Sequence, residues 1–378
     1  MRHSSTQPAQ CVPFLDLRPS HAGLKVELLE AVSALVDSNS YTNGPDVRLF
    51  EEEFAAYCGT DDAVGVASGL DALRLSLLAC GVEAGDEVIV PALTFVATVE
   101  AITQAGARPV LIDVSPDDYA IDPSQVEAAI SPRTRAILPV HLYGQLADMR
   151  RLTVLAADAD IALVEDACQA HGAERAGRRA GASGVAGCFS FYPGKNLGAM
   201  GDAGAVTTSD AALAGRVRAL REHGQTAKYV HEYEGYTARL DTIQALVLRH
   251  KLPFLEKWNE ERRRAAGVYL ERLENVGDLG LPAIALESRP AWHLFVVTTA
   301  NPNGLADFLA RRGIGAARHY PDPVHRTPAY NDLGHAEGAF PVAERLAHTV
   351  LSLPLYPGIS EQQLDCVIDE IRDYFDRA

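Results

Sequence analysis

The stretch EVIVPALTFVATVEAITQAGARPVLIDV, residues 87–114, contains two short apolar runs separated by a helix-like segment. The runs EVIVP and PVLIDV have the β-branched residues that favour strands, and TVEAITQAG between them has the pattern of a helix. The same alternation extends from about Ala63 to Val206. Near-continuous apolar strands that alternate with helices are typical of a largely parallel sheet covered by helices on both faces. Ligands of such α/β sheets lie at the carboxyl ends of the strands, so site residues are expected there.

The pattern changes after about Leu252. A long charged helix is predicted in PFLEKWNEERRRAAGVYLERLENV, followed by a strand in WHLFVVTTA, a helix in NGLADFLARRG and a long loop in RHYPDPVHRTPAYNDLG. We therefore predict two domains, with a boundary near Pro253. Residues 1–252 would form an N-terminal segment and the large domain, and residues 253–378 a smaller α+β domain.

The composition excludes several classes of protein. The formal net charge is −16, and Lys and Arg form no runs, so we expect no nucleic-acid partner. There is no apolar run of the roughly 18 residues that span a bilayer, and the start MRHSSTQPAQCVPF lacks the apolar core of a secretory signal. We therefore expect a cytoplasmic protein without a membrane partner. No metal site and no disulfide framework are expected from the scattered cysteines, which are Cys11, Cys58, Cys80, Cys168, Cys188 and Cys366.

A second stretch, GCFSFYPGKNLGAMGDAGAVTT at residues 187–208, places a single lysine, Lys195, among glycines. It is not a P-loop, because Asn196 follows the lysine and Phe189 stands where the first glycine belongs. A dinucleotide fingerprint is also missing, since VGVASGLDAL has only Ser68-Gly69 before its helix. Lys195 is then either a phosphate-binding cation or an amine nucleophile, and residues elsewhere must decide between these roles.

Three other positions bear on that choice, and each has an ordinary alternative. Gly69 begins a helix, where free backbone N–H groups favour an anion such as phosphate, although it could be a simple strand-to-helix turn. Asp166 ends an apolar strand, where it either caps the next turn or keeps a ring nitrogen protonated. Phe95 can stack on an aromatic ring or belong to the core. Taken together with Lys195, these features indicate a site for pyridoxal phosphate (PLP).

The chain resembles the nucleotide-sugar aminotransferases of the DegT/StrS type over nearly its whole length. The resemblance implies the aspartate aminotransferase fold (fold type I), with a mostly parallel seven-stranded sheet in the large domain. It also implies a homodimer whose active sites lie between the subunits. The stretches that carry it are NGPDVRLFEEEFAAYCG, SGLDALRLSLLACGVEAGDEVIVPALTFVATVEAI, VHLYGQLADM, VEDACQAHGA, SFYPGKNLGAMGDAGAV, LREHG and ARLDTIQALVLRHKL.

The resemblance implies a role for each residue of the cofactor site. Lys195 would form the Schiff base with PLP, and Asp166 would pair with the pyridine nitrogen; these two are the expected catalytic residues. Gln169 would meet the phenolic oxygen, and Phe95 would stack on the ring.

The residues expected to bind the phosphate match the family's pattern except at one position. Backbone amides of Gly69 and Leu70 and the hydroxyl of Ser190 would bind the phosphate. The family commonly has G-Y-N-S-R-L-D, whose Asn reaches the phosphate of the neighbouring subunit, but this chain has GYTARLD, with Thr237 in that place. Thr lacks the reach of an amide, so a phosphate contact by Thr237 stays open.

The expected reaction is transfer of an amino group from L-glutamate to C3 of a nucleotide-linked 3-keto-6-deoxyhexose in amino-sugar biosynthesis. We expect dTDP as the nucleotide and leave UDP open. SFYPGKNLGA resembles the branch that aminates C3, because the 4-keto branch usually has His where Tyr192 stands. The alternatives are a 4-keto aminotransferase, sugar deoxygenation, which Lys195 opposes because relatives with that activity have His there, and a non-catalytic regulatory protein of the same fold. The candidate substrate contacts are Tyr192, His231, Tyr320 and His325.

Overall fold

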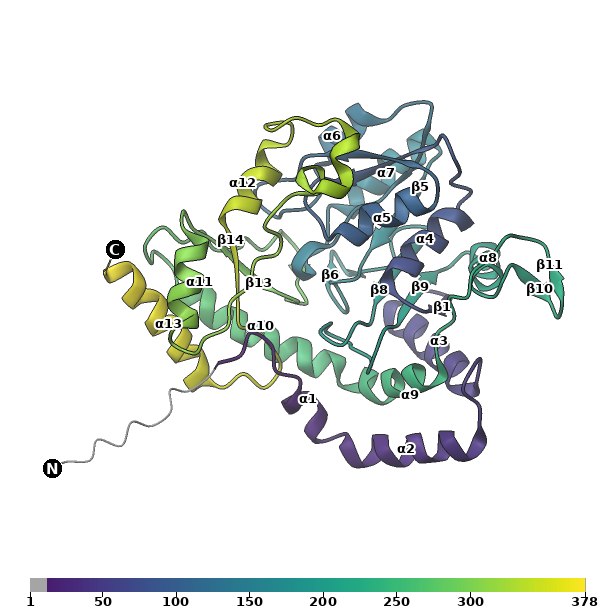
Figure 1. Ribbon diagram of the computed structural model, residues 1–378, viewed down its shortest axis with the longest axis horizontal. Helices are drawn as coiled ribbons and strands as arrows, with labels where there is room; N and C mark the ends of the chain where they lie inside the picture. The colour runs from purple at the N-terminus through teal and green to yellow at the C-terminus, as the bar shows by residue number, and fades with distance from the viewer. Residues whose placement is uncertain (1–11, 378) are drawn as a thin grey trace.

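The computed structural model describes residues 12–377 and is built on a seven-stranded sheet (Figure 1). Its strand order is β1-β9-β8-β5-β4-β2-β3. Only β9 runs antiparallel to its neighbours, β1 and β8, and the other pairs are parallel, which confirms the predicted sheet. The strands are β1 (Asp62–Val66), β2 (Glu87–Pro91), β3 (Arg108–Ile112), β4 (Thr134–Ile137), β5 (Ala162–Asp166), β8 (Ala186–Ser190) and β9 (Gly204–Thr208).

Helices cover both faces of the sheet because neighbouring strand residues point to opposite sides. Val88 and Val90 of β2 belong to the core beneath one set of helices, and Ile89 between them belongs to a core on the other face. The helices over the first face are α4 (Gly69–Ala79), α5 (Val96–Gln104) and α8 (Ala211–Arg221). Those over the second face are α3 (Pro45–Cys58), α6 (Pro123–Ala129), α7 (Met149–Ala159) and α9 (Thr242–Lys251).

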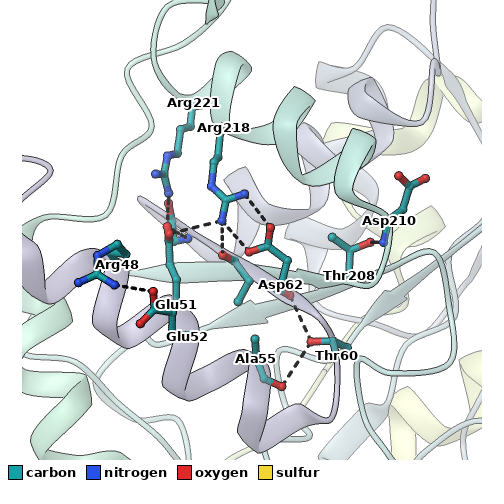
Figure 2. Close-up of polar contacts among 12 residues, drawn as sticks. Arg48, Glu51, Glu52, Ala55, Thr60, Asp62, Thr208, Asp210, Arg218 and Arg221 are labelled. Carbon is teal, nitrogen blue, oxygen red and sulfur yellow. Dashed lines mark hydrogen bonds and ion pairs between the residues drawn. The ribbon is translucent and has the colours of Figure 1, made fainter.

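Ion pairs attach α3 and α8 to the edge strand β1 (Figure 2). Arg218 binds both carboxylate oxygens of Asp62, at 2.6 and 2.7 Å. The Glu51 carboxylate accepts a hydrogen bond from the Gly65 amide at 2.8 Å, and Arg221 bridges Glu51 and the Gly65 carbonyl oxygen, each at 2.5 Å. Both backbone polar groups of Gly65 are thereby held, which fixes β1 just before the turn into α4.

The C-terminal region has its own core, to which α10 (Leu255–Arg272), α11 (Pro302–Ala310), α13 (Glu361–Asp376) and the paired strands β13 (Phe295–Thr298) and β14 (Val350–Leu353) contribute. Each region contributes residues to the hydrophobic core of the other. Val12 joins the C-terminal core, whereas Val324 and Tyr330 pack on the core of the large sheet. The boundary near Pro253, which falls in the 3-10 helix η2 (Leu252–Phe254), stays a prediction.

The loop predicted in residues 318–334 contains two short 3-10 helices, η3 (Val324–Arg326) and η4 (Pro328–Leu333). Helix α2 (Lys25–Ser38) follows α1 (Arg18–Ala22) and packs on α9 through one face. The remaining elements are η1 (Leu142–Gly144), α12 (Pro341–Thr349), the three-stranded sheet of β6 (Glu174–Arg175), β7 (Arg178–Arg179) and β12 (Ser288–Arg289), and the hairpin of β10 (Gln225–Ala227) and β11 (Val230–His231).

The five cysteines in residues 12–377 are free thiols. Cys11, like most of the N-terminal stretch MRHSSTQPAQCVPF, lies outside the described residues. Within residues 12–377 no helix combines the length and the apolar character needed to cross a bilayer. The cytoplasmic location stays a prediction.

Candidate active site

A cavity of about 590 Å³ lies where β1, β2, β4, β5 and β8 end. The turns that follow these strands supply most of its wall, and residues of the C-terminal region close it from the other side. This is the edge of the sheet at which the sequence places the chemistry. The cavity brings together nine of the predicted site residues: Gly69, Leu70, Phe95, Asp166, Gln169, Ser190, Tyr192, Lys195 and Tyr320.

Lys195 follows β8 in a glycine-containing turn, in which its backbone N–H donates to the carbonyl oxygen of Tyr192 at 2.8 Å. Burial lowers the pKa of the Lys195 amine because it disfavours the ammonium form, while the nearby Cys168 and Asp166 act in the opposite direction. A larger share of the amine is therefore neutral at a given pH than for an exposed lysine. A neutral amine can act as a nucleophile or accept a proton.

Asp166 is the last residue of β5, and both its carboxylate oxygens accept hydrogen bonds. Oδ1 accepts from the Cys168 amide at 3.1 Å and Oδ2 from the Thr98 hydroxyl at 2.8 Å. The hydroxyl of Thr94 lies 2.7 Å from that of Thr98. Because Thr98 uses its proton on Asp166, Thr94 must donate to Thr98. This chain of donors orients a buried carboxylate at the cavity wall.

The side-chain amide of Gln169 has one possible orientation. Its Oε1 accepts from the backbone N–H of Tyr143 at 2.8 Å, and this N–H can only donate. Its Nε2 therefore faces Tyr320, whose hydroxyl lies 3.0 Å away. Nε2 carries a second hydrogen that remains available to a ligand in the cavity. Burial raises the pKa of Tyr320, so this hydroxyl stays protonated at neutral pH.

The turn from β1 into α4 has room for an anion. Ser68 caps α4 by accepting from the Asp71 amide at 3.0 Å, whereas the amides of Gly69 and Leu70 have no partner among residues 12–377. A β-carbon at Gly69 would lie 2.6 Å from the β-carbon of Ser190, so only glycine allows this close approach. Two free amides at a helix N-terminus beside a hydroxyl form a suitable phosphate site.

Two aromatic residues of the cavity expose much of their surface. Phe95, at the N-cap position of α5, is 51% exposed, and its ring centroid lies 5.7 Å from that of Tyr320. Tyr192 is 59% exposed. An exposed ring in a cavity wall offers a flat apolar surface to a ligand.

Three predicted site residues do not line this cavity. His325 is buried elsewhere, with Nε2 2.9 Å from a carboxylate oxygen of Glu344, so it is corrected to a structural residue. His231 lies in the exposed β10–β11 hairpin, which projects from the body of the protein (Figure 1). Thr237 is also exposed, and its hydroxyl lies 3.3 Å from Nε2 of His223. His231 and Thr237 could contribute only to a site formed with another molecule.

The cavity also contains residues that the sequence analysis missed. Thr94 and Thr98 are one helical turn apart and resemble ordinary helix-start residues. His319 directly precedes Tyr320; burial and the Lys195 charge lower its pKa to about 4, and its Nδ1 lies 2.9 Å from the Ser352 hydroxyl. His293 stands before β13 in WHLF. The sequence marks these four residues only weakly as site residues. Each is a polar residue that lies near the end of a strand or next to a predicted substrate contact.

Comparison with known proteins identifies relatives over the full length. The model of the DegT/DnrJ/EryC1/StrS aminotransferase family matches residues 23–372. The dTDP-3-amino-3,4,6-trideoxy-alpha-D-glucose transaminase of Streptomyces venezuelae is 48% identical over 375 residues, which cover 99% of each chain. The crystal structure of S. venezuelae DesV in complex with a ketimine intermediate has a TM-score of 0.95 and 48% identity, and the match covers 97% of this chain and 99% of that one. Bacillus subtilis NtdA with bound cofactor PMP has a TM-score of 0.90 and 29% identity, covering 99% and 87%.

Proposed function

Because the chain belongs to the DegT/DnrJ/EryC1/StrS aminotransferase family, we propose that it is a PLP-dependent transaminase acting on a dTDP-linked 3-keto-6-deoxyhexose. The amino group would come from L-glutamate and be placed on C3 of the sugar. The observation that carries the proposal is that Lys195, Asp166 and Gln169 meet the open N-terminus of α4 in one cavity. Such a reaction belongs to the biosynthesis of amino sugars.

The residues of the cavity fit PLP. The free amides of Gly69 and Leu70 and the Ser190 hydroxyl would hold the phosphate, where the backbone of Gly69 comes close to Ser190. Asp166 would face the pyridine nitrogen, and the free hydrogen on Gln169 Nε2 would meet the phenolic oxygen. The exposed Phe95 ring would lie on the pyridine ring, and Lys195 would bind the aldehyde carbon.

The mechanism assigns a separate task to each side chain. When bound, PLP supplies the electron sink that makes the α-hydrogen of the amino acid acidic. The neutral amine of Lys195 would accept this proton and deliver it to the aldehyde carbon, a task that its lowered pKa favours. Asp166, oriented by Thr98 and by the Cys168 amide, would keep the pyridine nitrogen protonated.

The apolar wall of the cavity supports a deoxygenated sugar. Phe14, Leu15, Leu294, Leu353 and Leu355 line it from the C-terminal side and the N-terminal segment. A 6-deoxyhexose presents a methyl group that could be buried against such a wall, whereas a uronate would place an unpaired carboxylate there.

Tyr192 supports the choice of C3. It lies three residues before Lys195, lines the same cavity and exposes its ring to it. A residue at that distance from the lysine can hold one carbonyl carbon of the sugar at reaction distance in preference to its neighbour. The relative from S. venezuelae is named for a 3-amino sugar.

We further propose that the active enzyme is a homodimer with both sites at the subunit interface. Among the described residues that line the cavity, Lys195 is the only lysine or arginine, although the substrates carry a diphosphate and two carboxylates. Cations from a second subunit would complete the site. The exposed face of α2 supports this, because Val26, Leu29 and Val36 lie at i, i+3 and i+10 on one side of the helix and are 70%, 60% and 55% exposed.

The test is to incubate the purified protein with L-glutamate and a panel of 3-keto and 4-keto 6-deoxyhexoses on dTDP and on UDP. Products are identified by mass and NMR, and Lys195→Ala is the control. We expect a 3-amino product, formed fastest on dTDP and absent with the control variant. A 4-amino product would refute the regiochemistry, and the absence of amino transfer to every sugar would refute the enzyme assignment in favour of a regulatory protein.

A further inference from the structure

Lys251, the last residue of α9, is a buried lysine that the mechanism above does not use. Its side chain is sealed from solvent, with an exposed fraction of 3% for the residue. Burial lowers the pKa of its amine to about 8, and no carboxylate among residues 12–377 acts in the opposite direction. The amine is therefore still mostly protonated at neutral pH. A buried cation without a carboxylate partner is costly, whereas an apolar side chain would fill this space without that cost.

The ammonium of Lys251 contacts the loop that carries Lys195. Its Nζ donates to the carbonyl oxygen of Gly198 at 2.6 Å, a short distance of the kind expected for a charged donor. No backbone amide of residues 12–377 binds the same oxygen. Gly198 is itself buried, so its carbonyl group would lose its partner if the ammonium were removed, and a buried carbonyl group without a partner is unfavourable.

The loop is folded tightly on itself, which links the position of Gly198 to that of Lys195. The Ala199 amide donates to the carbonyl oxygen of Phe191 at 2.7 Å and closes the loop. A β-carbon at Gly198 would lie 2.3 Å from the carbonyl oxygen of Pro193, so only glycine allows this close approach. The chain before Lys195 and the chain after it are thus in direct contact. A bond that holds Gly198 therefore also limits the movement of Lys195.

Two other side-chain contacts hold the same loop. Gln244, about two turns before Lys251 on α9, accepts from the Met200 amide at 2.8 Å. Asn196 donates to the carbonyl oxygen of Ala291, just before β13, at 2.8 Å. Because these contacts remain when the ammonium is removed, loss of the Lys251 bond should loosen the loop without unfolding the protein.

Building on the proposed transaminase function, we propose that Lys251 is a positioning residue for Lys195. Its ammonium holds the loop, and the loop presents Lys195 and Tyr192, which both line the cavity. The bond matters most while Lys195 is free of the cofactor, because no covalent link then holds its side chain. No covalent bond forms or breaks on Lys251.

The first experiment measures how often the loop opens. Amide hydrogen exchange of the full chain is followed by mass spectrometry in the wild type and in Lys251→Met, which has an unbranched side chain without a donor. A hydrogen bond from a charged donor changes an equilibrium by about tenfold or more, so the peptide that covers residues 192–201 should exchange about tenfold faster or more. The peptide that covers β5 should be unchanged and is the internal reference.

The second experiment measures how well Lys195 is placed. The full chain, freed of cofactor, captures added PLP, and the absorbance change is followed at increasing PLP concentrations. The half-saturating concentration reports the phosphate site, which Lys251 does not contact, and should stay nearly unchanged in Lys251→Met. The limiting rate reports Lys195 and should fall about tenfold, because displacement of a reacting group by about 1 Å can cost 10²-fold in rate. A role in stability alone would not separate these two quantities.

The control is Tyr269→Phe, which removes another buried hydrogen bond to a carbonyl oxygen, from the Tyr269 hydroxyl to Pro354 in the C-terminal core at 3.0 Å. It should leave both the loop exchange and the limiting rate unchanged. Unchanged exchange or an unchanged limiting rate in Lys251→Met, or equal changes in the control, would overturn the proposal. A Lys251→Met chain that does not fold would overturn it as well, because the lysine would then serve the whole fold.

The two experiments keep this proposal separate from the proposed function. Neither needs an amino acid or a sugar, and the exchange experiment needs no cofactor. A wild-type chain that captures no PLP would contradict the proposed function, whereas the exchange experiment would still decide whether Lys251 holds the loop.

Discussion

Replacing Asp166 by Asn should separate the charge of this side chain from its structural contacts. Asn can make the same bonds, because its Oδ1 would accept from the Cys168 amide and its Nδ2 would donate to Thr98, whose hydroxyl would then turn toward Thr94. The structure therefore predicts a folded variant, with a free energy of unfolding within about 1 kcal/mol of the wild type. Only the negative charge is lost.

The charge should have a large effect on rate. A carboxylate about 4 Å from a pyridinium charge, at the effective dielectric of about 20 that suits protein sites, interacts by about 4 kcal/mol. If the whole interaction energy stabilises the transition state, its loss in Asp166→Asn should slow transamination about 10³-fold, since each 1.36 kcal/mol is a factor of ten in rate.

The assay is the single-turnover half-reaction with L-glutamate, followed by cofactor absorbance, alongside urea unfolding to confirm the fold. Asp202→Asn is the matched control, because Asp202 lines the same cavity but is exposed. It should change the rate less than about threefold, as expected for an exposed charge screened by solvent. A half-reaction rate for Asp166→Asn within tenfold of the wild type, or an equal loss in Asp202→Asn, would refute the role of the Asp166 charge.

Three further predictions follow from the same contacts. Thr98→Val removes the donor to Asp166 and should lower the free energy of unfolding by about 1.5–3 kcal/mol, while Thr98→Ser should lose less than about 1 kcal/mol, both measured by urea titration; equal losses would exclude the hydroxyl as the cause. Thr237→Ala should weaken PLP binding less than about threefold in an equilibrium titration, because the short side chain points to the surface, and a tenfold loss would show a phosphate contact across subunits. Burial lowers the pKa of His171 to about 3 and of His319 to about 4, so both are neutral in the folded state but protonated in the unfolded state below their usual value of 6.5. Each should therefore remove stability as the pH falls below 6.5, with a slope that rises toward about 1.4 kcal/mol per pH unit near pH 5, and a flat profile of unfolding free energy would contradict their burial as neutral rings.

The sheet and the places of the candidate cofactor residues in it were predictable because their signals are local. Asp166 ends an apolar run, Gly69 begins a helix and Lys195 follows a strand, and each pattern lies within about ten residues. In a parallel sheet, such strand ends meet at one edge. Their meeting in one cavity therefore follows from the topology, without knowledge of any side-chain contact.

The residues that support them were not predictable, because their partners are distant in sequence. Thr98 meets Asp166 across 68 residues, and Gln169 meets Tyr320 across 151. Nothing local marks Thr98 as more than a helix-start residue. The antiparallel direction of β9 was also hidden, since the apolar run of a strand has no direction.

The histidines of the C-terminal loop illustrate the same limit. His319 and His325 lie six residues apart in one polar segment, and only His325 was predicted to contact the substrate. The difference between them comes from Glu344, 19 residues beyond His325. Its carboxylate contacts the ring of His325, which therefore does not line the cavity. His319 instead stacks on Phe14 of the N-terminal segment, with centroids 5.6 Å apart, and lines the cavity.

The most direct test of the central claim is borohydride reduction of the purified protein with its cofactor, followed by peptide mapping. We expect that one cofactor is fixed per chain, on the peptide that contains Lys195, and that Lys195→Ala carries none. Labelling of a different lysine, or no labelling of a protein that still transfers amino groups, would contradict the assignment of this cavity as the active site.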